Sequence, residues 1–208
     1  MVTAMTAFAS TIRRAIPAET DRVADLLAEA FLYGDFGPYL VPNVETRDRV
    51  YRPYFRILTE HALAAGWIDV TEQLTATAIW YPIGERLDLD IPGYDTRLAQ
   101  ACGEYLRRFV ALDRAMHAHH PTGVPHHYLA HLGVHPDRQR QGLGSALLEH
   151  HHARLDADGV PAYLEATGSR NGALYRRHGY LPRQGYRVPD GPPLYPMWRR
   201  PRPAGEAG

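Results

Sequence analysis

The chain has 208 residues, and 23 basic side chains balance 23 acidic ones, so its formal net charge at pH 7 is zero. Without a net charge there is no global field to attract nucleic acid or an anionic membrane, and we expect neither as a partner. This length predicts one domain with a substantial core, which we place at residues 1–200, followed by a disordered tail at residues 201–208 (PRPAGEAG).

The single cysteine, Cys102, excludes an internal disulfide and suits the reducing cytoplasm, which is the location we expect. It lies on an apolar helical stripe, so it is expected to be a small core residue rather than a nucleophile. No apolar run approaches the ~18 residues of a membrane span. The first residues, MVTAMTAFASTIRR, carry their charge after the apolar segment, which argues against a signal peptide.

The first elements in chain order are a strand and a helix. Residues 11–16 predict a strand that Pro17 ends, because proline cannot donate to a sheet ladder. Apolar residues from Val23 to Phe31 then recur at helical spacing, which predicts one buried helix face. A second helix is expected within residues 45–65, where Pro53 would mark its start or a kink.

Between these two helices, residues 33–43 (YGDFGPYLVPN) predict a loop, because glycine, proline and aromatic residues dominate. Tyr33, Phe36 and Tyr39 either floor a pocket for an acceptor molecule or pack against the core. The sequence leaves these two interpretations open.

Two β-rich runs, residues 66–70 and 74–81, predict a hairpin. Glu85, Asp88 and Asp90 follow in a loop. Their acidic side chains either form solvated surface or attract a cationic amine. Apolar residues at intervals of three or four from Leu98 to Met116 predict one long helix.

Histidines cluster in the second half of the chain. His150, His151 and His152 are adjacent in a helical pattern and diverge by about 100° each, so they cannot converge on one ion. No H-E-x-x-H motif occurs. We therefore expect no metal site. His131 differs from the others, because it lies on a strand that leads into a glycine-rich loop.

That strand, residues 128–134, ends at His135-Pro136, and the sequence Gln139-x-x-Gly142-x-Gly144 leads directly into a helical pattern. Glycines let a ligand approach the backbone, and the unpaired amides and dipole of a helix N-terminus favour an anion. The loop is neither a P-loop, since the chain has no lysine, nor G-x-G-x-x-G. These residues predict a phosphate cradle.

Further along, residues 160–166 (VPAYLEA) predict a strand and residues 171–180 (NGALYRRHGY) a helix. A turn-rich strand pair follows, at residues 181–188 and 194–199. The glycine loop and the later block, in this order, resemble the pyrophosphate loop and the Asn-to-Tyr helix of the GCN5-related N-acetyltransferases (GNATs).

Within that superfamily the chain is most similar to the puromycin N-acetyltransferase group. The similarity is dense from residue 129 onward and rests on AIWYP (78–82), LGVHPD (132–137), GLGSA (142–146), GVPA (159–162), LE (164–165), RN (170–171) and VPDGP (188–192). Residues 33–43 and the loop near Asp88 differ, and Arg140 replaces a glycine common in the family. Because loops often carry substrate choice, puromycin itself does not follow.

The resemblance implies an α/β fold of layered type, with a mixed, mostly antiparallel sheet of six to seven strands, flanked by helices and splayed at the acetyl-CoA site. It implies acetyl-CoA as the cofactor. The residues expected to bind it are Leu132, Gly133, Val134, Gln139, Arg140, Gln141, Gly142, Leu143, Gly144, Ser145, Asn171 and Tyr175.

Amide formation requires a base, because an alkyl ammonium with a pKa near ~10 is mostly protonated at neutral pH and cannot attack a thioester. Glu165 matches the group's base and ends an apolar strand; His131 is the second candidate, since a histidine pKa suits the task. The resemblance assigns Tyr175 as the acid that protonates the leaving thiolate. A backbone N–H within residues 132–134 is expected to bind the thioester oxygen.

We therefore expect direct acetyl transfer to a primary amine of a small molecule, antibiotic-like or metabolic. Tyr33, Phe36, Tyr39, Trp80 and Glu165 are expected to line the acceptor site. The alternatives are a protein or peptide N-acetyltransferase and a non-catalytic acetyl-CoA-binding regulator. Use of a longer acyl-CoA stays open, and so does the oligomeric state, for which a homodimer is one option.

Overall fold

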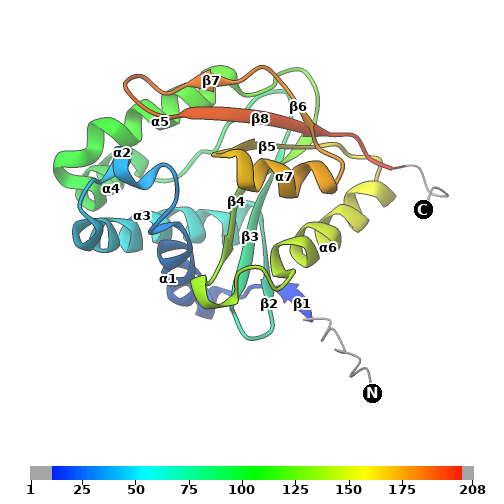
Figure 1. Cartoon of the computed structure of the whole chain (residues 1–208), viewed down its shortest axis with the longest axis horizontal. Coiled ribbons are helices and arrows are strands. Elements are labelled where there is room, and N and C mark those ends of the chain that lie inside the picture. The colour runs from blue at the N-terminus through cyan, green and yellow to red at the C-terminus, as the bar shows by residue number, and fades with distance from the viewer. Residues whose placement is uncertain (1–10, 203–208) are drawn as a thin grey trace.

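The computed structural model describes residues 11–202 and shows a mixed α/β domain with helices on both faces of an open sheet (Figure 1). The residues before Thr11 and most of the expected tail, 203–208, lie outside the described residues. In chain order the elements are β1 (Ile12–Arg14), α1 (Thr20–Phe31), α2 (Gly37–Leu40), α3 (Val44–Ala65), β2 (Trp67–Thr71), β3 (Ala76–Ile83), α4 (Tyr94–Cys102), α5 (Leu106–His119), β4 (His126–Val134), α6 (Leu143–Ala157), β5 (Ala162–Ala166), α7 (Ser169–Arg177), β6 (Leu181–Pro182), β7 (Tyr186–Arg187) and β8 (Pro193–Arg199), with 3-10 turns at Pro17–Glu19, Gly103–Tyr105 and Pro136–Arg138.

The sheet has eight strands in the order β1-β2-β3-β4-β5-β8-β6, with β7 also paired to β8. Every pair is antiparallel except β4 with β5. This confirms a mixed, mostly antiparallel sheet. The expected count of six to seven strands was low, because the single strand predicted at residues 181–188 is divided into the two-residue strands β6 and β7.

Strict alternation along β3 separates two hydrophobic cores. Ile79 and Tyr81 face the layer of α1, α3, α4 and α5, where Phe55 and Phe109 are also buried. Ala78 and Trp80 face the layer of α6 and α7 and pack with residues such as Leu147. The sheet is therefore apolar on both faces and is covered by helices on both.

The helix predicted from Leu98 to Met116 is divided, so that prediction was wrong about its continuity. Gly103 has φ +52° and ψ −126°, a backbone conformation that side chains rarely adopt, and it ends α4 at Cys102. A 3-10 turn then leads into α5, which starts at Leu106. The break lets α4 and α5 follow different directions around one volume. Cys102 is buried in the core, as expected.

Helix α3 is continuous through Pro53, so this proline does not mark the start of the helix. The helix begins where the side chain of Asn43 accepts a hydrogen bond from the Thr46 amide at 2.8 Å. Pro53 itself is exposed, so the carbonyl that its missing N–H leaves unpaired can bind water. The predicted loop at residues 33–43 contains one short helix, α2.

Strands β4 and β5 diverge after only two paired positions, His127 with Ala162 and Tyr128 with Tyr163. Figure 1 shows the result: β3 and β4 are drawn steeply, close to the vertical of the view, whereas β5 and β8 run nearly horizontally. A β-bulge at Ala130 in β4, opposite the step from Ile79 to Trp80 in β3, adds to the twist of β4 at this point. The sheet is therefore open between the C-terminal parts of β4 and β5.

None of the helices formed by residues 11–202 is both long and apolar enough to cross a membrane.

We expect Gly103→Ala to lower the free energy of unfolding by about 1–3 kcal/mol, because alanine pays the full cost of the left-handed backbone there. The space around Gly103 is open, so a steric clash would not contribute. Gly84→Ala is the matched control: its surroundings are equally open and its φ is ordinary. Urea unfolding measures both, and equal losses in the two variants would contradict this explanation of the helix break.

Candidate active site

The gap between β4 and β5 exposes backbone amides. His135 donates its N–H to the carbonyl of Thr75 at 2.9 Å, so alternate amides of β4 point toward β3. The amides of Leu132 and Val134 therefore point away from β3, into the gap. On the side facing away from β3, no strand of the described residues pairs with this part of β4, so these donors are available to an extended ligand.

The glycine-rich loop forms the expected cradle directly beside the gap. Gly142, with φ +83°, is the N-cap of α6, and the first amides of that helix have no acceptor within it. A side-chain carbon at Gly142 would meet no atom within 4 Å, so its outer face is free. Arg140 also adopts a left-handed backbone, with φ +63°. A non-glycine residue with this φ is strained, so the loop geometry is kept here at the cost of backbone strain.

Several predicted cofactor residues shape the site through bonds within the protein. Asn171 accepts from the Gly168 amide at 3.0 Å and donates to the Thr167 hydroxyl at 2.9 Å, so it fixes the turn between β5 and α7. The Ser145 hydroxyl lies 3.0 Å from Nε2 of His178. The Gln139 side chain donates to the carbonyl of Val134 at 3.3 Å. Leu143, Gly144 and Gln141 lie in the cradle beside them, and Gly133 lies on β4 against α1.

Glu165, on β5, faces the same side of the sheet as Tyr163. Its Oε1 accepts hydrogen bonds from the hydroxyls of Tyr163 at 2.8 Å and Tyr186 at 3.3 Å. Its Oε2 is buried and has no partner among the described residues. Burial raises the pKa of Glu165 to about 7, although the tyrosine hydroxyls oppose the rise. A carboxyl group with this pKa exchanges its proton near neutral pH.

His131 reaches the same face because of the bulge in β4, which turns both Ala130 and His131 toward it. The imidazole packs edge-on against Phe31 and Phe55, with ring centroids 5.8 and 5.4 Å apart, and its Nδ1 has no partner among the described residues. Burial lowers the pKa of His131 to about 4, so it is neutral at pH 7.

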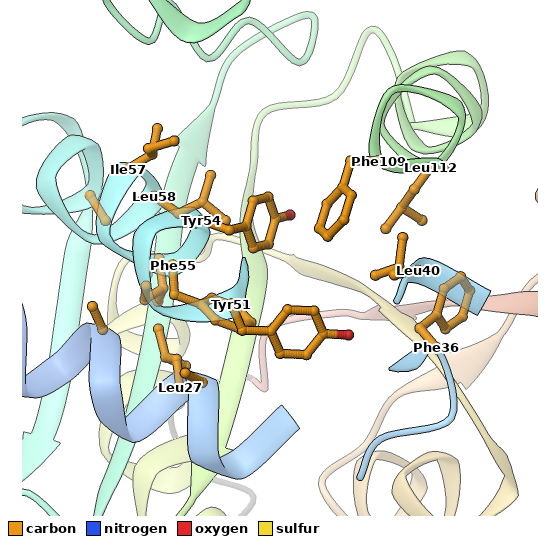
Figure 2. Packing of buried hydrophobic residues seen from close by; sticks show 14 of the residues in the cluster. Leu27, Phe36, Leu40, Tyr51, Tyr54, Phe55, Ile57, Leu58, Phe109 and Leu112 are labelled. Atoms are coloured by element: carbon orange, nitrogen blue, oxygen red, sulfur yellow. The ribbon is translucent and has the colours of Figure 1, made fainter. Parts of the chain in front are cut away.

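A cavity of about 490 Å³ extends from the strand gap into the layer of α2, α3, α4 and α5. Figure 2 shows Tyr51 and Tyr54 of α3 directing their hydroxyl ends toward Leu40 and Leu112 of α2 and α5. The residues that line the cavity are mostly apolar or aromatic: Phe31, Gly34, Asp35, Phe36, Gly37, Leu40, Tyr51, Tyr54, Phe55, Leu58, Tyr81, Leu87, Leu89, Ile91, Tyr94, Leu112, Asp113, Arg114, Met116, His117, Tyr128, Ala130, His131, Glu165, Thr167 and Leu194.

Carboxylates outnumber permanent cations in this lining. The lining contains three carboxylates, Asp35, Asp113 and Glu165, and one permanent cation, Arg114. Asp35 and Arg114 are exposed. Asp113 is partly buried, and its Oδ2 accepts a hydrogen bond from the Tyr94 hydroxyl at 2.8 Å. The cavity therefore favours cationic over anionic ligands.

The predicted acceptor residues do not all meet at the cavity. Phe36 and Glu165 line it, but Tyr33 is 75% exposed and lies outside the lining. Tyr39 donates to the carbonyl of Pro189 at 3.0 Å and is also outside the lining. Trp80 is placed on the opposite face of the sheet, stacked on His151 at 4.1 Å, because alternation along β3 directs it toward α6.

The loop after β3 contributes its apolar rather than its acidic residues. Leu87, Leu89 and Ile91 line the cavity, whereas Glu85, Asp88 and Asp90 are exposed. Of the two interpretations of this loop, the structure supports solvated surface for its acids.

Tyr175, on α7, is buried in the core between α6, α7 and the sheet, 5.9 Å from the ring of Tyr180. Its hydroxyl makes no hydrogen bond with a described residue. Burial raises the pKa of Tyr175, which keeps the phenol protonated at neutral pH. The raised pKa also makes this phenol a weaker acid than an ordinary tyrosine.

Sequence reasoning missed the far wall of the cavity, above all Asp113 and the tyrosines of α3 and α4. One signal was present. Asp113 is four residues after Phe109, within the stripe formed by Phe109, Leu112 and Met116, where a carboxylate is out of place on a purely structural helix.

The histidines pair with each other and with other side chains. His151 lies 2.8 Å from Asp69 and 3.0 Å from His127, and His120 lies 3.0 Å from His126. No group of three His, Cys, Asp or Glu within residues 11–202 is placed to hold a metal ion.

Comparison with known proteins agrees with this geometry. Residues 100–182 match the model of the acetyltransferase (GNAT) domain. The chain is similar to the structure of a histone acetyltransferase HPA2 and related acetyltransferase from Corynebacterium glutamicum, with 27% identity, coverage of 94% of this chain and 98% of that one, and a TM-score of 0.71.

Two further structures share the fold. The ribosomal-protein-S18-alanine N-acetyltransferase of Escherichia coli is 19% identical, with 95% and 97% of the two chains covered and a TM-score of 0.52. Arylalkylamine N-acetyltransferase 2 of Aedes aegypti is 12% identical, with 92% and 99% covered and a TM-score of 0.61. Protein and small-molecule acetyltransferases are thus both among the neighbours. The match of residues 100–182 to the GNAT acetyltransferase domain, together with a fold consistent with that of the neighbouring structures, supports an acetyltransferase of the GNAT type.

Proposed function

We propose that the chain transfers an acetyl group from acetyl-CoA to a primary amine of a small molecule. The observation that carries this proposal is the cavity itself: it starts at the strand gap beside Glu165 and is lined by residues of α2–α5 and by Leu87, Leu89 and Ile91. A protein acceptor would need an open groove for a peptide, and the helices that surround the cavity occupy that space. The resemblance to the puromycin N-acetyltransferase group agrees with a small, amine-bearing acceptor.

The residues present fit acetyl-CoA. The free amides at the start of α6 and the left-handed Gly142 suit a pyrophosphate, and the amides of Leu132 and Val134 suit an extended chain in the gap. Acetyl-CoA supplies an activated acetyl thioester. A peptide amide of β4, such as that of Leu132, would donate to the thioester oxygen, where negative charge increases as the amine attacks.

Glu165 would take the proton from the acceptor ammonium. Its pKa near 7 matches the working pH, whereas the lowered pKa of His131 makes that imidazole a weak base. The free amine then forms the C–N bond as the C–S bond breaks, and the nitrogen loses its second proton to water, which leaves a neutral amide. Tyr175 would donate its proton to the departing thiolate. In this scheme no protein nucleophile is needed.

The cofactor site is tested with Gly142→Asp and Gly142→Asn. Both side chains tolerate a left-handed backbone and both cap helices well, so both variants should fold. They fill the same open space, but only aspartate places a negative charge against the pyrophosphate. We expect coenzyme A to bind Gly142→Asp at least about tenfold more weakly than Gly142→Asn by calorimetry, with a smaller difference at high salt. Equal, wild-type affinities would remove the cradle from the cofactor site.

The base is identified by comparing Glu165→Gln with His131→Gln. Glutamine at 165 keeps the shape but cannot accept a proton, so kcat should fall by about 10²-fold or more. The rise of kcat/KM with pH, centred near pH 7 in the wild type, should disappear in Glu165→Gln and persist in His131→Gln. The opposite pattern would assign the base to His131.

The same pKa predicts an effect on stability that controls for misfolding. Because folding raises the pKa of Glu165, wild-type stability should fall as pH rises from the ordinary glutamate value to about 7, and then level off. The Glu165→Gln variant has no carboxyl at this position, so its stability does not fall with pH for this reason. The Tm of the variant relative to wild type should therefore rise between pH 5 and pH 8; a constant difference would show that the carboxyl is not held in its neutral form.

Tyr175→Phe tests the proposed acid. The hydroxyl would act only as the C–S bond breaks, so kcat and kcat/KM should fall together while the KM for acetyl-CoA changes little. If the variant melts earlier but turns over normally with chemistry rate-limiting, Tyr175 is only a packing residue.

A further inference from the structure

We propose that the acceptor is a dication and that Asp113, which lines the cavity from α5, binds its second cationic group. This inference rests on the proposed function and narrows it: the acceptor is a diamine or an amine that also carries a guanidinium. One amine reacts beside Glu165, and the other group is held, still protonated, by Asp113.

The position of Asp113 suggests this role. Asp113 on α5 and Glu165 on β5 line one cavity from different elements, so a single ligand can contact both. Oδ2 of Asp113 is engaged by the Tyr94 hydroxyl, and no cation of the described residues forms a salt bridge with it. Its second oxygen is therefore available to a ligand.

The chemistry of the site favours a cation over a neutral donor. A carboxylate partly removed from water keeps an uncompensated charge if its only partners are hydroxyl groups. An ammonium or guanidinium restores both charge balance and hydrogen bonding, and a charge pair of this kind also selects among ligands. Burial raises the pKa of Asp113 to about 6, which still leaves it mostly ionised at pH 7.5.

The apolar part of the cavity lining fits a hydrocarbon linker. Tyr51, Tyr54, Leu58 and Leu112 line the cavity and offer apolar and aromatic surface. Such walls pack well against methylene groups, but they do not determine which end of a hydrocarbon linker points toward Glu165. Orientation then comes from the two ends, since the group beside Asp113 determines which amine reaches Glu165.

The test uses α,ω-diaminoalkanes and n-alkylamines of matched length, with wild type, Asp113→Asn and Asp88→Asn. Asp88 is an exposed acid outside the cavity lining and controls for loss of net charge. We expect wild type to prefer diamines by at least about tenfold in kcat/KM. Asp113→Asn should lose that preference because the KM for diamines rises, whereas kcat/KM for the monoamines should change by about twofold or less. Asp88→Asn should match wild type.

Asp113→Glu provides a second measurement that does not depend on the asparagine variant folding. It keeps the charge but extends it by one methylene, so the preference for diamines should persist with a shift to a shorter optimal length. The inference is overturned if wild type does not prefer diamines, or if Asp113→Asn weakens monoamines and diamines equally. Acetylation of monoamines alone would leave the proposed function standing and reject this inference, whereas no transfer to any amine would reject the proposed function itself.

Discussion

The site depends on the short pairing of β4 with β5. Two parallel residue pairs hold the strands together, and beyond Tyr128 and Tyr163 they diverge. Continued pairing would use the amides of Leu132 and Val134 in the ladder and would leave no room for a thioester. The bulge at Ala130 twists β4 at the same point and turns His131 toward the cavity. The gap, the free amides and the orientation of both candidate bases thus have one geometric origin.

Burial then separates the roles of the two candidate bases. The same removal from water acts in opposite directions on an acid and on an imidazole, because in each case it disfavours the charged form. The pKa of Glu165 rises to about 7, and that of His131 falls to about 4. Hydrogen bonds from the hydroxyls of Tyr163 and Tyr186 keep the pKa of Glu165 from rising further. The burial of both groups beside the cavity that we propose for a small acceptor therefore also sets their pKa values.

Local patterns predicted most of the fold and the glycine turn that starts α6, because helical spacing, prolines and the Gln139–Gly144 loop act within a few residues. The break at Gly103 was missed, since one glycine within an apolar repeat gives no sign that its φ is positive. Trp80 was assigned to the acceptor site, but strand alternation directs it to the other face. Asp113 was missed because its role depends on α5 meeting β5 across a cavity, and no local pattern encodes such a meeting.

The central claim is that acetyl transfer takes place at the gap between β4 and β5. A crystal structure with a bisubstrate analogue, in which coenzyme A is joined through its acetyl group to an alkylamine, tests it directly. We predict that the pyrophosphate lies on the amides of α6, the acetyl carbonyl lies against β4 near Leu132, and the amine nitrogen lies within hydrogen-bond distance of Glu165 or one water away. An analogue whose amine lies outside the cavity, or whose acetyl group avoids the gap, would contradict it.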